Sequence, residues 1–185
     1  MPLLDELFSG DDERASAVAP LAGVEHLPAL AAALTGPDPA ARWWAVVALA
    51  HIPGDNVTQL LVHTAQDGDP DLRAAALHAL GQHGGSDALP VLLQALGDAS
   101  DYLARLATDA LVHVTPSAVP ELVALLKTHP QPRARANAAR ALAFIGDTSA
   151  IPALFGALSD DSILVQHWAD EGLERMGVGQ IYFKP

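Results

Sequence analysis

The chain has 185 residues, with 22 acidic and 10 basic side chains and a net charge of −12 when histidine is neutral. This length fits one ordinary domain, and the acidic balance argues against nucleic acid or an anionic membrane as partner, because phosphate binding requires a basic surface. The absence of cysteine excludes disulfides, thiolate nucleophiles and cysteine-based metal sites. Only 9 residues are aromatic whereas 36 are alanine, which predicts closely packed helices with a core of small side chains.

The N-terminal segment gives the first indication of location. Its first ten residues include Asp5 and Glu6 and no basic side chain, which is unlike a secretory signal. No apolar run in the sequence approaches the roughly 18 residues that a membrane-spanning helix requires. We therefore expect a cytoplasmic protein that does not act on membranes.

In chain order, residues 1–25 predict a shortened helical repeat. Leu3, Leu4 and Leu7 indicate a first helix, and the series Asp11, Arg14, Ala17 and Leu21 indicates a second. This segment is interpreted as an incomplete copy of the unit that follows it.

Residues 26–176 predict five regular copies of a 31-residue unit. Alanine and leucine each recur five times at this spacing, and a polar residue precedes each such helix, followed by proline in three copies. The columns are Ala45, Ala76, Ala107, Ala138 and Ala169; Leu49, Leu80, Leu111, Leu142 and Leu173; Asp38, Asp69, Ser100, Gln131 and Ser162; and Pro39, Pro70, Asp101, Pro132 and Ile163. Because Asp or Ser caps free backbone N–H groups and Pro suits a first turn, these columns predict helix starts.

A second, shorter apolar series lies between these helices. Its groups are Leu27/Leu30/Leu34, Val57/Leu60, Leu89/Leu92/Leu96, Val119/Leu122/Leu126 and Ile151/Leu154/Leu158. Each unit is therefore predicted to be a helical hairpin with a first helix, a short loop, a second helix and another loop. A terminal hairpin leaves an apolar face bare, so residues 177–185, which contain Ile181, Tyr182 and Phe183, are expected to form a capping tail on a single repeat domain that covers residues 1–185.

The row Asp69–Gly81, DPDLRAAALHALG, resembles a HEAT-like repeat, in particular the short-period class named after phycobilisome (bilin) lyases. The arginine typical of this class stands at Arg42, Arg73 and Arg135, while Ala104 and Gln166 fill the same slot in the other units. The resemblance implies an all-α fold, a right-handed α-solenoid of about six helical hairpins, whose second helices line a concave face. Members of the class are protein-binding scaffolds, lyase subunits or, rarely, enzymes, so the resemblance defines fold more closely than function.

Positions between the buried columns are predicted to face the concave side. Asp109, Arg140 and Glu171 alternate in sign at 31-residue spacing, either as a solvated ladder or as a strip that orients a partner. The tryptophans lie near the two ends of this face, where they either anchor a partner or pack against the end repeats. The predicted binding face comprises Trp43, Trp44, His78, Arg105, Asp109, Asn137, Arg140, Phe144, Trp168 and Glu171.

The sequence shows no nucleophile elbow, phosphate-binding loop or dinucleotide fingerprint. His78, Asp109 and His113 suggest a His/carboxylate metal set, but such sets also arise by chance on polar faces. The predicted function is therefore a non-catalytic scaffold, without catalytic residues, metal or cofactor, that binds a basic or apolar protein or peptide and not nucleic acid. The alternatives are a subunit or partner of a bilin lyase or chaperone-like system, which the resemblance implies, and a His/carboxylate metalloenzyme.

Overall fold

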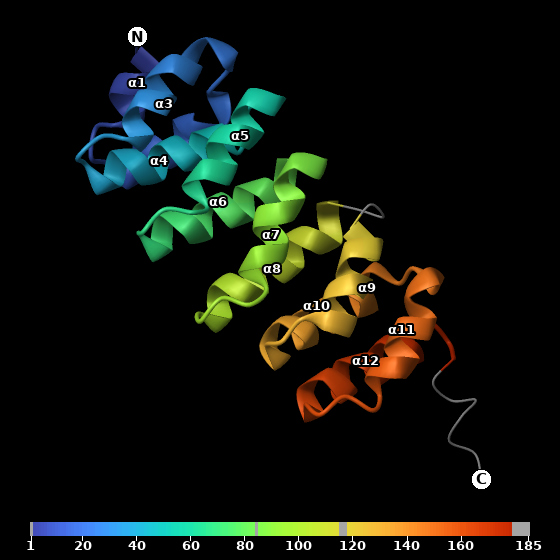
Figure 1. Cartoon of the computed structure of the whole chain (residues 1–185). Helices are drawn as coiled ribbons and strands as arrows, with labels where there is room; N and C mark the ends of the chain where they lie inside the picture. Colours follow the sequence, from blue (N-terminus) through green and yellow to red (C-terminus); the bar gives the residue numbers. More distant parts are fainter. Residues whose placement is uncertain (1, 84, 115–117, 179–185) are drawn as a thin grey trace. The chain divides into compact units, whose positions relative to one another are not determined.

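The computed structural model of the chain describes residues 2–83, 85–114 and 118–178 (Figure 1). These residues form helices, short 3-10 turns and loops, and no strand occurs among them. They fall into two compact units, divided between Val91 and Leu92. The all-α architecture predicted from the repeat is confirmed, and each unit is described by itself below.

The first unit begins with two short helices and continues with longer hairpins. Its elements are α1 (Pro2–Leu7), α2 (Asp12–Val18), η1 (Ala19–Leu21), η2 (Val24–His26), α3 (Leu27–Leu34), α4 (Pro39–Leu49), α5 (Asp55–Thr64), α6 (Pro70–His83) and η3 (Ser86–Ala88). Helices α1 and α2 pack together in the segment predicted to be a shortened repeat, and the pairs α3/α4 and α5/α6 follow as antiparallel hairpins (Figure 1).

The second unit repeats the hairpin arrangement. The division falls within α7 (Leu89–Ala95), and the elements that follow are α8 (Asp101–Val114), α9 (Val119–Thr128), α10 (Pro132–Ile145), η5 (Thr148–Ala150), α11 (Ile151–Ala157) and α12 (Ile163–Arg175). Helix α10 packs between α8 and α12, and α9 and α11 form the adjoining layer. Two layers of helices therefore enclose the core of this unit.

The second helices of the five regular repeats start where the sequence predicts. They begin at Pro39, Pro70, Asp101, Pro132 and Ile163, 31 residues apart. The carboxylates of Asp38 and Asp69 accept backbone hydrogen bonds from Ala40 and Asp71, as expected of helix caps. Gln131 and Ser162 accept no such bond, so the start of α10 depends more on the fixed φ of Pro132.

The alanine and leucine columns form the core. All ten members, Ala45, Ala76, Ala107, Ala138, Ala169, Leu49, Leu80, Leu111, Leu142 and Leu173, are at most 1% exposed. A further column at the same spacing consists of Ala48, Ala79, Ala110, Ala141 and Gly172. At Gly172, an added Cβ would lie 3.1 Å from both Ala143 Cβ and Leu154 Cδ1. Small side chains are thus required because neighbouring helices approach closely.

The outer face of α12 differs from that of α10. Ala136, Ala139 and Ala143 of α10 are at most 2% exposed. The residues 31 positions later are polar: His167, Asp170 and Glu174. These polar side chains suit contact with water, whereas the capping role of residues 177–185 stays a prediction. Ile181, Tyr182 and Phe183 of the predicted tail lie outside the described residues.

Among the described residues, no single helix is both long and apolar enough to cross a membrane. One pair of segments, Asp12–Leu21 and Val24–Leu34, meets this requirement together by length and composition, but the pair is bent by 119°. Within this pair, Ala15, Ala19 and Leu30 are buried in the first unit. The cytoplasmic location stays a prediction.

In two repeats, the arginine slot links the second helix to the loop before the next second helix. In the second unit, Arg135 Nε and Nη2 donate to the two carboxylate oxygens of Asp160, both at 2.8 Å, and Nη1 donates to the carbonyl of His129 at 3.0 Å. The Arg135 and Asp160 side chains are only 11% and 13% exposed. The hydrogen bond from Arg135 lowers the pKa of Asp160 against the opposing effect of burial. In the first unit, Arg42 Nη2 lies 3.6 Å from Asp69.

We predict that Asp160→Asn lowers the free energy of unfolding at pH 7 by about 1–3 kcal/mol, because it breaks a largely buried bidentate pair. The folded-state pKa of Asp160 lies below its unfolded-state value. The pair therefore contributes fully above the unfolded-state pKa, and this contribution is lost as the pH falls from about 4 through the folded-state pKa. Urea unfolding followed by far-UV circular dichroism at several pH values measures both effects.

The matched control is Glu174→Gln, which neutralises an exposed carboxylate on α12 and is expected to change stability by less than about 0.5 kcal/mol. An Asp160→Asn variant that is as stable as this control at pH 7 would contradict the assigned role of the pair.

Candidate functional site

The second helices expose one line of side chains on the side away from the buried columns. Residues four apart on a helix share a face, so each helix contributes two positions to this line. In the second unit the positions are Asp109 and His113 on α8, Arg140 and Phe144 on α10, and Glu171 and Arg175 on α12; we call this line the second-helix stripe. The same columns in the first unit hold Val47, His51, His78 and Gln82.

An aromatic–arginine cluster, formed by Arg140, Phe144, Trp168 and Arg175, lies on this stripe. The Arg140 Cζ is 5.3 Å from the Trp168 ring centroid and 5.7 Å from that of Phe144. The Arg175 Cζ is 4.4 Å from the Phe144 centroid, and the two rings lie 6.1 Å apart with a tilt of 45°. These distances allow cation–π attraction between guanidinium groups and rings. Phe144 nevertheless remains 43% exposed, so an aromatic surface stays open to a partner.

The predicted ladder of alternating charges forms in part. Arg140 Nη2 lies 3.5 Å from Asp109 Oδ1, across neighbouring helices, as the spacing suggests. Glu171 instead accepts from Arg175 Nε at 2.8 Å, one turn away on its own helix. Arg140 is thus left beside the two rings, and its buried Nε has no hydrogen-bond partner. Exposed pairs of this kind contribute about 0.2–1 kcal/mol each, so they orient side chains more than they stabilise the fold.

Two other predicted residues of this unit have local structural contacts. The Asn137 Nδ2 donates to the carbonyl of Leu96 at 2.9 Å, which ties α10 to the loop before α8. The Arg105 Cζ lies 5.7 Å from the ring centroid of Tyr102 on the same helix. Asn137 therefore satisfies a backbone carbonyl, whereas Arg105 and Tyr102 are exposed.

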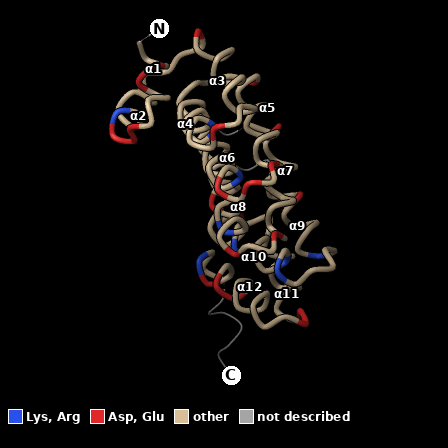
Figure 2. The backbone as a smooth tube through the Cα atoms, turned by 90° about the vertical axis from the view of Figure 1, so that its left-hand side faces the viewer, with Lys and Arg blue, Asp and Glu red and all other residues tan. Residues whose placement is uncertain are grey.

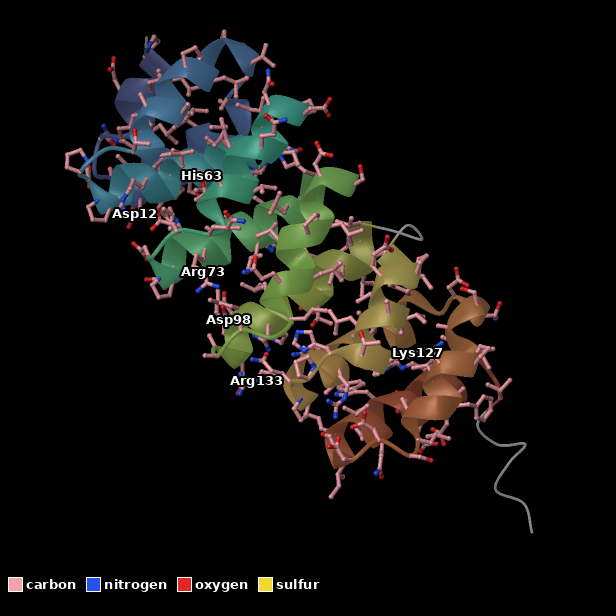
Figure 3. The ribbon with its side chains drawn as sticks, viewed as in Figure 1. Asp12, His63, Arg73, Asp98, Lys127 and Arg133 are labelled. Atoms are coloured by element: carbon pink, nitrogen blue, oxygen red, sulfur yellow. The ribbon has the colours of Figure 1, made fainter. Side chains whose placement is uncertain are left out.

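The predicted residues of the first unit lie on α4 and α6. Trp44 Nε1 donates to Asp12 Oδ1 at 3.1 Å, so this tryptophan contacts the shortened first repeat, one of the two interpretations left open by the sequence (Asp12 in Figure 3). Trp43 is 38% exposed. The His78 and Gln82 side chains are 3.1 Å apart, within hydrogen-bond distance on α6.

The histidine and carboxylate residues do not define a metal centre. Among the described residues, no three His, Asp or Glu side chains are grouped so that they could hold a metal ion. Asp109 and His113 are one turn apart on α8 in the second unit, whereas His78 belongs to the first. The described geometry thus gives the metalloenzyme alternative no support.

Two surface recesses are lined by residues at equivalent positions of the repeat. One, of about 240 Å³ in the first unit, includes Leu60, His63, Thr64 and Asp67 in its lining. The other, of about 220 Å³ in the second unit, includes Ala153, Gly156, Ala157 and Asp160, which stand three repeat lengths later. Because the same positions line both, these recesses are products of hairpin stacking and indicate no particular ligand.

Sequence reasoning missed Arg175 and Asp12. Arg175 stands 31 residues after Phe144, so the column that contains Phe144 leads directly to it. Asp12 belongs to the shortened repeat, where the 31-residue spacing fails, and its contact with Trp44 has no counterpart in the sequence columns.

Helical hairpins that recur every 31 residues and bury matching columns define an α-solenoid repeat protein. The chain belongs to the HEAT repeat family, whose model, described as HEAT repeats, matches residues 27–112 and 113–174. Phycocyanobilin lyase subunit beta of Pseudanabaena tenuis (strain PCC 7409) is 33% identical over 123 residues, which are 66% of this chain. The resemblance to bilin-lyase-type HEAT repeats is thus confirmed, although the match spans only 43% of that relative's length.

Solved structures support the same fold. The Escherichia coli protein YibA matches with a TM-score of 0.61 and 20% identity, over 97% of this chain and 71% of the other. A chain of the CpcE–CpcF complex of phycocyanin lyase from Nostoc sp. PCC7120 matches with a TM-score of 0.55 and 23% identity, over 83% of this chain and 65% of the other. A designed armadillo repeat protein in complex with the peptide (KR)4 matches with a TM-score of 0.52 and 20% identity, over 95% of this chain and 98% of the other. These likenesses confirm the solenoid class.

We predict that Asn137→Ala lowers the free energy of unfolding by about 1–2 kcal/mol, because the Leu96 carbonyl loses its side-chain donor. The control is Arg105→Ala, an exposed change expected to stay within about 0.5 kcal/mol. Chemical denaturation of both variants checks this. Equal stability of the two variants would contradict the structural role of Asn137, and its side chain would then be a candidate for contact with a partner.

Proposed function

We propose that the chain is a non-catalytic scaffold that binds a protein or peptide on its second-helix stripe. The observation that carries this proposal is the aromatic–arginine cluster, in which Phe144 remains 43% exposed although two guanidinium groups flank its ring. Binding hot spots are enriched in aromatic residues, which bury a large area with little loss of side-chain freedom, and in arginine, whose planar guanidinium forms several hydrogen bonds and stacks on rings. The proposal includes the concave shape that the repeat class implies for this face.

The side chains of the cluster are already oriented to receive an apolar side chain of a partner. Arg140 is held by Asp109 and Trp168, and Arg175 is held by Glu171, so the side chains around Phe144 are already oriented. A partner that covers Phe144 therefore orders few additional side chains, which favours affinity. The charges nearby are balanced in sign, so an apolar or aromatic side chain fits this position better than a strongly charged one.

The chain's net charge of −12 supports a basic partner elsewhere on the surface. A designed repeat protein of similar fold was solved with the basic peptide (KR)4, which shows that helical repeats of this kind can present a surface to a cationic chain.

We expect Phe144→Ala to weaken binding of the native partner by at least about tenfold, because an anchor contributes roughly 1–2 kcal/mol or more. The partner is first identified by affinity capture from native extract and mass spectrometry, and binding is then measured by calorimetry with the purified partner. The control is Tyr102→Ala, which removes an exposed aromatic from α8 outside the cluster. Unchanged affinity for Phe144→Ala would remove the cluster from the binding site.

A second candidate function is a subunit or partner of a bilin lyase system. It is favoured by the 33% identity to phycocyanobilin lyase subunit beta and by the fold shared with the CpcE–CpcF complex. CpcE and CpcF form a complex of two chains, so under this candidate the stripe binds a companion subunit.

The lyase candidate predicts that the chain, alone or with the identified partner, changes the absorption spectrum of added phycocyanobilin. Protein binding restricts the conformation of a flexible tetrapyrrole, so the visible band should shift and sharpen. Serum albumin at equal concentration controls for nonspecific uptake of the pigment. A spectrum identical to that of the free bilin, with and without the partner, counts against this candidate and leaves the scaffold proposal standing.

A further inference from the structure

Negative charge is concentrated in the first unit. Residues 1–91 contain 12 acidic and 3 basic side chains, whereas residues 92–185 contain 10 acidic and 7 basic side chains. Figure 2 shows few blue positions in the first unit. Its three arginines are already engaged by the protein: Arg14 with Asp11 at 3.2 Å, Arg42 with Asp69 at 3.6 Å, and Arg73 Nε with the Ala65 carbonyl at 3.4 Å. Acidic side chains therefore outnumber the arginines that could pair with them fourfold in this unit.

Helix α4 presents aromatic side chains within this acidic unit. Trp43 and Trp44 are adjacent, so they project about 100° apart around the helix, and Trp43 shares a face with Val47, four residues later. Trp43 is 38% exposed, an unusual exposure for so large an apolar residue. Indole faces attract ammonium and guanidinium groups more strongly than other aromatic rings do.

Asp12 adds a charge beside these rings. Its Oδ1 accepts from Trp44 Nε1 at 3.1 Å, which holds the carboxylate next to the indole. Asp12 is exposed, and no Lys or Arg among the described residues forms an ion pair with it. The neighbouring Asp11 is different, because it caps α2 and pairs with Arg14. A cation that approaches Trp44 thus meets a fixed carboxylate whose charge is not neutralised.

We propose that α4 binds a lysine- or arginine-bearing segment of the partner, with the cationic head group paired to Asp12 and placed against the indoles of Trp43 and Trp44. This inference rests on the proposed scaffold function and names the chemistry of the partner at the first unit. Charge complementarity favours this occupant over an acidic or purely apolar segment, because every basic side chain of the unit is already engaged.

The test uses the full chain and an eight-residue peptide of alternating Lys and Arg, with binding measured by calorimetry at low and at physiological salt. Asp12→Asn keeps an oxygen acceptor for Trp44 and removes only the charge. We expect it to weaken peptide binding about fivefold, and Trp43→Leu to weaken it about threefold or more. Circular dichroism verifies that each variant keeps its helix content.

Two controls locate the effect. Asp87→Asn removes the same charge from η3, beyond the C-terminal end of α6, and is expected to change affinity less than twofold. Tyr102→Ala in the second unit removes an exposed aromatic side chain outside the aromatic–arginine cluster and is expected to leave peptide binding unchanged. An eight-residue glutamate peptide should not bind.

The inference is overturned if the basic peptide does not bind, or if Asp87→Asn weakens binding as much as Asp12→Asn, because attraction is then nonspecific. It is also overturned if Asp12→Asn and Trp43→Leu bind the peptide as tightly as the unmodified chain. These outcomes are separate from failure of the scaffold proposal, which depends on the native partner and on Phe144.

Discussion

Each hairpin of this chain has an apolar face that only a neighbouring hairpin can cover, and this requirement underlies the rest of the structure. The covering surface is made of alanine at five equivalent positions and leucine at five others, all nearly inaccessible to solvent. Small residues allow helices to approach closely, and dispersion contacts then accumulate over many atoms. At Gly172, even a methyl group would meet Ala143 and Leu154 at 3.1 Å. An alanine-rich core thus restricts substitution although each side chain is small.

The same packing leaves the exposed line of the second helices free to vary. The buried columns are occupied by nearly the same residue in every repeat, whereas the exposed column at Val47 continues as His78, Asp109, Arg140 and Glu171. Substitutions at the exposed members of this column, His78 and Asp109, are expected to cost little stability. Function in such a fold resides in the exposed residues and not in the backbone that carries them. This is why the fold defines the family while the partner depends on individual side chains.

Much of the fold was predictable because the helix period and the repeat spacing are properties of the chain alone. The starts of all five regular second helices and the burial of Ala107 and Leu111 followed from the columns. The site was less predictable, because side-chain pairing depends on rotamers and on the distance between helices. Glu171 pairs with Arg175 on its own helix instead of with Arg140, and Asn137 serves a loop carbonyl. Column spacing identifies which residues share a face, but not which of them meet.

The two units show how one repeat can carry different recognition chemistry. In the second unit, the rings of Phe144 and Trp168 are flanked by Arg140 and Arg175, which leaves little attraction for another cation. In the first unit, Trp44 is bound to a carboxylate and the surrounding charge is negative, so the same kind of ring attracts a cation. An indole or phenyl ring is therefore selective only through its charged neighbours. The two proposals therefore assign different chemistry to the two units: an apolar anchor at Phe144 in the second, and a cationic side chain beside Asp12 in the first.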